Sequence, residues 1–124
     1  MYRIVLLVIL FLISLSLFSQ KSLKYKLIGK WRIQNYEVFG EVHQPSLKES
    51  NDYILFKTDM FFEAFSEGYH DKGTWRLNGE TKISLIVDNN EILDATVLQI
   101  TSDFLTIKYN TKELNYIIFH YKKQ

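Results

Sequence analysis

Few residues of this sequence have the types needed for acid–base or metal chemistry, and they are widely spaced. The three histidines are His43, His70 and His120. No two of them have the spacing of metal ligands, so no metal site is predicted. Ser66 or Ser46 with His70 and Asp71 would supply a hydroxyl, an imidazole and a carboxylate, but no Gly-x-Ser-x-Gly elbow presents either serine. The sequence therefore predicts no catalytic residue, and an enzyme is the least favoured class.

One carboxylate is distinguished by its surroundings, because Glu63 lies within the apolar run Met60–Phe65. If its side chain points into an apolar interior, its pKa is perturbed and it would orient a bound ligand. The alternative is that Glu63 faces water beside Lys57 or Arg76. Both interpretations stay open on the sequence alone.

The composition fits one domain with a large aromatic core. The chain has 124 residues, with 8 Tyr, 9 Phe and 2 Trp. Its 15 basic and 14 acidic residues leave a formal charge of +1, which argues against a nucleic-acid binder. It has no cysteine, so burial without disulfides must stabilise the fold. No glycine-rich phosphate loop is present, and no cofactor is predicted.

The N-terminus has the pattern of a signal peptide. Arg3 precedes an apolar run over residues 4–18, which is about 22 Å long as a helix. A bilayer core is about 30 Å thick, so the run is short for a stable span. We predict a signal peptide over residues 1–19, cut before Gln20, and export to the periplasm or the medium; an uncleaved anchor is the alternative. The mature chain, residues 20–124, then has balanced charge and no expected long-range steering.

The rest of the chain consists of short β-rich runs separated by turn residues, a pattern typical of a sandwich or barrel. The expected strands are Trp31–Phe39, Tyr53–Phe56, Met60–Phe65, Lys72–Leu77, Lys82–Val87, Ile92–Ile100, Phe104–Tyr109 and Leu114–Tyr121. Asn78-Gly79 predicts a type I′ hairpin turn, because both residues tolerate positive φ. The change of phase after Trp31 and Ile33 predicts a β-bulge near Gln34-Asn35.

Short connections favour pairing between strands that are consecutive in sequence. Closure of that meander would remove its two unpaired edges. Leu23, Leu27 and Ile28 have the spacing of a short helical turn that caps the domain. We therefore predict an all-β fold, an eight-stranded antiparallel up-and-down barrel with a short N-terminal helix.

Two features of the predicted barrel have consequences for partners. The connection Gly40–Asp52 is long enough to be a lid or a crossover. Phe61 and Phe65 lie opposite Phe62 on the same strand, so both faces of that strand are apolar. A second apolar face would be covered by the N-terminal helix or by a second subunit. The alternative is that its aromatic residues are simply exposed, which is common on protein surfaces.

Two short motifs resemble a known family. Gly29-Lys30-Trp31 after a short helix, and the later Gly73-Thr74-Trp75, are similar to strand entries of lipocalin-like barrels. The resemblance covers roughly residues 23–121. It implies that Gly29 turns the chain into the first strand and that Trp31 plugs one barrel end. In lipocalins a late-strand arginine packs across that tryptophan, whereas here the last strand ends Tyr121-Lys122-Lys123.

The resemblance implies a non-enzymatic barrel that binds a small hydrophobic ligand among aromatic walls with a few polar groups. The candidate ligand-binding residues are Trp31, Tyr36, Phe56, Phe62, Glu63, Phe65, Trp75 and Tyr116. The alternative is an envelope protein-interaction module, such as a protease-inhibitor-like barrel that acts through its loops, chiefly Gly40–Asp52. A protein partner or a homodimer is compatible with either function.

Overall fold

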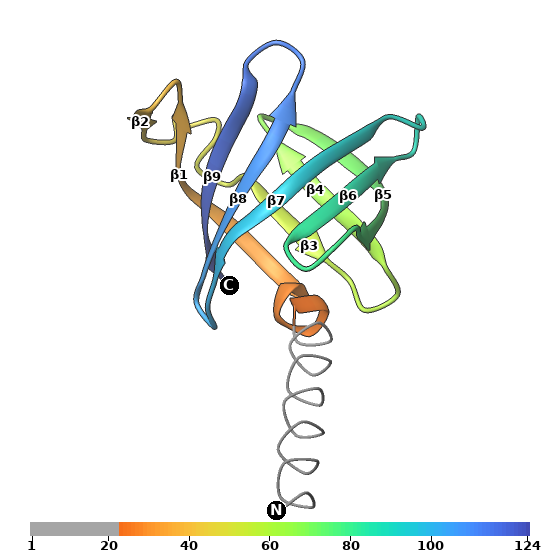
Figure 1. The fold of residues 1–124 in the computed structure, drawn as a ribbon. Helices are drawn as coiled ribbons and strands as arrows, with labels where there is room; N and C mark the ends of the chain where they lie inside the picture. The colour runs from red at the N-terminus through yellow and green to blue at the C-terminus, as the bar shows by residue number, and fades with distance from the viewer. Residues whose placement is uncertain (1–22) are drawn as a thin grey trace, which may run out of the picture.

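The computed structural model describes residues 23–124. They form one antiparallel sheet in which each strand pairs with its neighbour, and β1 also pairs with β9. This pairing closes the sheet into a barrel of eight strands, β1 and β3 to β9 (Figure 1). The predicted all-β barrel is confirmed. The predicted signal peptide lies outside the described residues.

The strands reproduce the eight predicted runs, with one addition. They are β1 (Gly29–Val38), β2 (Glu41–His43), β3 (Tyr53–Phe56), β4 (Phe61–Ser66), β5 (Tyr69–Leu77), β6 (Lys82–Val87), β7 (Ile92–Ile100), β8 (Phe104–Thr111) and β9 (Asn115–Lys123). The addition is β2, three exposed residues that pair with the end of β1 outside the barrel wall. No sequence pattern predicts it, because a three-residue strand has too few residues to show an alternation.

A short helix over residues 23–27 lies at one end of the barrel (Figure 1). Its Leu27 is fully buried in the same core cluster as the large aromatic residues Trp31, Phe56 and Trp75. The indole nitrogen of Trp31 donates a hydrogen bond to the Leu27 carbonyl at 2.8 Å. Side chains therefore fill this end of the barrel, which we call the closed end. Within residues 23–124 no helix has the length and apolar character needed to cross a membrane.

The predicted β-bulge in β1 is confirmed, since the register with β9 shifts between Ile33 and Asn35. Before the shift Ile33 pairs with Tyr121, and after it Tyr36 pairs with Phe119. The extra residue turns Tyr36 inward, where its ring meets Phe119 edge-on at 5.9 Å. The bulge therefore brings an aromatic ring to the end of the barrel opposite the helix.

The prediction of a type I′ turn at Asn78-Gly79 is wrong. The connection between β5 and β6 has four residues, and of these two only Gly79 has positive φ, at 151°. Asn78 instead donates two hydrogen bonds. Its backbone N–H donates to Lys82 O at 2.8 Å, and its side-chain amide donates to the Ser84 hydroxyl. This side-chain bond offers an alternative to the tight turn that the dipeptide predicted.

The indole N–H of one closed-end tryptophan has a hydrogen-bond acceptor and that of the other does not, which leads to a prediction about stability. Trp75 has the one buried side-chain polar atom without a partner in the described part of the chain, whereas Trp31 has its bond to Leu27. Changing either residue to phenylalanine loses similar volume. Trp31→Phe also leaves the Leu27 carbonyl without its donor, so it should cost about 1–2 kcal/mol more than Trp75→Phe. Urea unfolding measures the difference, and equal losses would contradict it.

Candidate functional site

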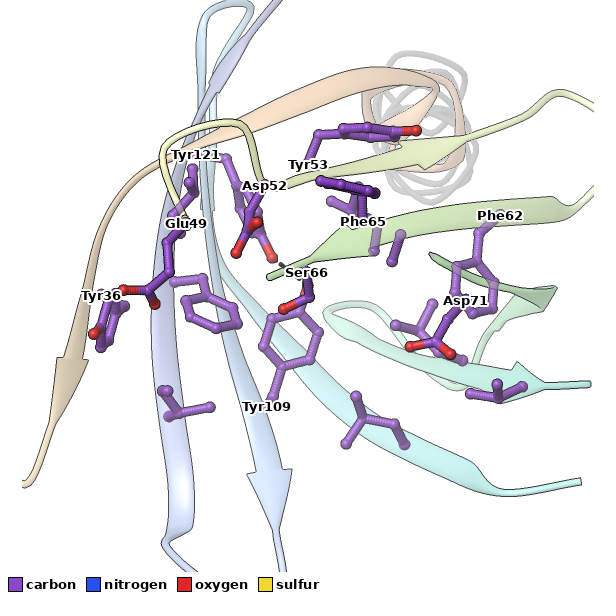
Figure 2. A pocket seen from close by; sticks show the side chains of 18 of the residues that line it. Tyr36, Glu49, Asp52, Tyr53, Phe62, Phe65, Ser66, Asp71, Tyr109 and Tyr121 are labelled. Carbon is purple, nitrogen blue, oxygen red and sulfur yellow. Dashed lines mark hydrogen bonds between the residues drawn. The ribbon is translucent and has the colours of Figure 1, made fainter. Parts of the chain in front are cut away.

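A cavity of about 290 Å³ opens at the end of the barrel opposite the helix, which we call the open end. All eight strands of the barrel contribute to its wall, together with the long connection before β3 (Figure 2). The lining residues are Ile33, Tyr36, Glu49, Asp52, Tyr53, Ile54, Phe62, Ala64, Phe65, Ser66, Asp71, Leu85, Val87, Leu93, Tyr109, Thr111, Ile117, Phe119 and Tyr121. The barrel is thus packed at one end and hollow at the other.

The deep wall of the cavity is apolar. Phe62 and Leu85 are buried and form its base, and Phe119 packs edge-on against both Tyr109 and Tyr121. The two phenols bond to each other at 2.8 Å. Burial raises the pKa of both Tyr109 and Tyr121, so both hydroxyls stay neutral. Because the two hydroxyls are hydrogen-bonded to each other, they need no polar group of a ligand as a partner.

The rim of the cavity is acidic. Figure 2 shows the carboxylates of Glu49, Asp52 and Asp71 around the opening, with Glu49 beside Tyr36. One oxygen of Asp52 accepts the Glu67 backbone N–H at 3.0 Å. Burial raises the pKa of Asp52, and the charges of Glu49 and Glu67 raise it further against the lowering effect of that bond. No lysine, arginine or histidine is among the lining residues.

Three of the eight predicted ligand-binding residues line this cavity: Tyr36, Phe62 and Phe65. Phe65 lies at the rim, with its ring stacked on Tyr53 at 5.9 Å. The structure places Trp31, Phe56 and Trp75 in the closed-end core instead, where none of them lines the cavity. Their side chains point into the barrel, as expected, but they lie at the closed ends of their strands and so do not reach the cavity.

Glu63 and Tyr116 lie outside the cavity lining. Glu63 forms an ion pair with Lys57 at 2.9 Å and lies 3.6 Å from His70. The hydrogen bond from Lys57 lowers the pKa of Glu63, which matches the water-facing alternative. Tyr116 lies under the ammonium of Lys108, 4.5 Å from its ring centroid. Both residues have the outward phase of their strands, so neither reaches the interior.

The sequence reasoning missed the polar part of the site. Tyr109 and Tyr121 carried a usable signal, since they continue the inward alternation of β8 and β9. Glu49 and Asp52 carried none, because they lie in an irregular connection whose path no periodicity describes. Asp71 adjoins His70 in the sequence, a pattern most simply read as an exposed hairpin loop and not as a cavity wall. In the structure His70 lies against Glu63, and within residues 23–124 no group of three His, Asp or Glu could hold a metal.

The closed end shows how a late-strand cation replaces the arginine of lipocalins. The ammonium of Lys123 lies 4.6 Å from the Trp31 ring centroid and donates to the Ile28 carbonyl at 2.8 Å. Gly29 has φ of 133° at this point, as the strand entry requires. Lys123 thus supplies a cation–π contact to Trp31 at the place where the resemblance implies an arginine.

Comparisons with known proteins agree with this geometry. The family model of the lipocalin-like domain matches residues 27–107, from the capping helix into β8. A search of the curated proteins found no match.

Proposed function

Because the chain belongs to the lipocalin-like domain family, we propose that it is an exported, non-catalytic protein that binds a small hydrophobic ligand in its barrel. The observation that carries this proposal is the cavity of about 290 Å³ with its apolar base. Export rests on the signal-peptide pattern of residues 1–19. The proposal assigns Tyr36, Phe62 and Phe65 to the ligand wall and adds Phe119 from β9.

The volume limits the size of the ligand. At roughly 30 Å³ for each water-sized group, the cavity holds a chain of about ten heavy atoms. Small-molecule pockets begin near this size and combine apolar walls with a few polar groups. A short alkyl or monocyclic body therefore fits, whereas a long-chain lipid would extend out of the opening.

Filling the cavity should weaken binding strongly while the barrel still folds. Ala64 lines the cavity on β4, so Ala64→Phe would place a ring in the space of the ligand. We expect at least a roughly tenfold loss of affinity for decanol, a neutral ten-carbon probe, measured by calorimetry. The matched control is Leu98→Phe on the exposed outer face of β7, which should bind as the unchanged protein does. Undiminished binding by a folded Ala64→Phe protein, or no binding by the unchanged protein, contradicts the proposal.

A specific observation favours a second candidate, a protein-interaction role through the connection around β2. Phe39, Val42 and Leu47 are 76%, 58% and 95% exposed there, and β2 has a partner on one edge only. Exposed apolar groups beside an unpaired strand edge are suited to protein contact. If this is the function, Leu47→Ser should lose a cross-linked partner recovered from envelope extract while decanol binding is unchanged.

A further inference from the structure

We propose that the cavity selects amphiphiles with a cationic head group, such as an alkylamine, over those with a carboxylate. This inference rests on the proposed binding function and gives the charge of the ligand. It follows from the arrangement of the rim, where Glu49, Asp52 and Asp71 surround the opening of an otherwise apolar space (Figure 2).

The rim carboxylates have no cationic partner in the described part of the chain. The ion pairs there join Lys57 and His70 to Glu63, and His120 to Glu37, none of which lines the cavity. Arg32 comes close to the connection before β3, but it donates to the Ser50 carbonyl and the Asn51 side chain. The negative charge of the rim is therefore left for a bound ligand or for solvent.

Asp52 occupies the centre of this arrangement. It is partly buried, it has one backbone hydrogen bond from Glu67, and it lies near Glu49. A carboxylate that is desolvated next to like charges is unfavourable for folding unless something compensates it. A cationic head group at the opening would supply that compensation, whereas an anionic head group would add to the repulsion.

The cavity is apolar at its base and charged at its opening, which matches the apolar chain and polar head group of an amphiphile. Phe62 and Leu85 form the apolar base, and the phenols of Tyr109 and Tyr121 already bond to each other. The charged groups are at the opening. An alkyl body would thus lie deep, and its head group would lie among the carboxylates, beside the ring of Tyr36.

The wider charge distribution acts in the same direction. The connections at the open end, residues 39–40, 44–52, 67–68, 88–91 and 112–114, join the strand ends around the mouth. Their acidic residues are Glu49, Asp52, Glu67, Asp88, Glu91 and Glu113, and Lys48 and Lys112 are their basic ones. The open end is therefore negatively charged although the total charge of the chain is nearly balanced. Its negative charge attracts cations from a distance.

Three probes with the same ten-carbon chain test the inference: decylammonium, decanol and decanoate. Calorimetry on the purified protein near neutral pH should give an affinity for decylammonium at least roughly tenfold above that for decanoate, with decanol between them. The ratio should shrink in high salt, because partly exposed charges are screened. Asp52→Asn keeps the acceptor for the Glu67 N–H and should reduce the ratio several-fold. The control Asp103→Asn, on an exposed connection at the closed end, should leave the ratio unchanged.

The outcomes separate this inference from the proposed function. Equal affinities for the three probes, or tighter binding of decanoate, would overturn the charge preference while the cavity remains a binding site. A ratio that Asp52→Asn and Asp103→Asn change equally would also overturn it. If none of the three probes binds, the proposed function itself fails.

Discussion

Gly73→Ala is expected to destabilise the barrel by about 3 kcal/mol or more, at the upper end of overpacking effects. A Cβ at this position would lie 1.9 Å from the Ile86 carbonyl oxygen and 2.9 Å from a ring carbon of Phe62. Rotation of the Phe62 ring relieves the second clash, but the first is with backbone. Relief would require β5 to move away from β6, where Gly73 pairs with Val87.

Gly68 provides the matched control for this substitution. Its φ of 90° is unfavourable for alanine, yet no atom lies within 4 Å of the position of its Cβ. Gly68→Ala should therefore cost only the backbone strain, about 1–2 kcal/mol. Urea unfolding of both variants gives the comparison. A loss for Gly73→Ala no larger than that for Gly68→Ala would show that the β5–β6 approach is not the constraint.

The strands and their order could be predicted because period-two alternation is a local property. In β6, Ile83 and Leu85 are buried on one face, as their spacing indicates. The bulge after Ile33 was equally visible as a break in phase. Closure followed from short connections and unpaired edges. Each of these inferences needs only a few neighbouring residues.

The site was less predictable because position along a strand, as well as phase, determines what lines a cavity. Trp31 and Tyr36 both point inward, but only Tyr36 is near the open end. Asp52 and Asp71 both line the cavity from different parts of the chain, and no local pattern relates them. The sequence therefore predicts that the interior is aromatic. The acidic rim could not be predicted, because it depends on how distant parts of the chain come together.

Acidification should weaken the binding of decylammonium roughly tenfold, because protonation of Asp52 removes a charge at the rim. The titratable groups that act on Asp52 are Glu49 and Glu67, with Tyr121 beside it, and Tyr36 lies next to Glu49. The pKa of each phenol is raised, so neither changes charge on acidification. Calorimetry between about pH 4 and pH 7 should show the affinity falling as pH falls through the raised pKa of Asp52.

Stability of the unliganded barrel should change in the opposite direction over the same range. Because the pKa of Asp52 is higher in the folded state, the folded protein binds more protons between the ordinary and the raised value. The free energy of unfolding therefore rises as pH falls through that window, and the ionised carboxylate is destabilising above it. Asp52→Asn should remove this slope and stabilise the protein at neutral pH by on the order of 0.5 kcal/mol, a small value because the group is partly solvated.

This opposition distinguishes a binding carboxylate from a structural one. A structural carboxylate would lose stability on neutralisation, whereas Asp52 should lose only its preference for the cationic probe. Urea unfolding of the unchanged and Asp52→Asn proteins across the same pH range provides the test, with Asp103→Asn as the control. If Asp52→Asn is less stable than the unchanged protein at neutral pH, Asp52 contributes to folding through contacts that outweigh its repulsion from Glu49 and Glu67, and a ligand is not needed to explain its place at the rim.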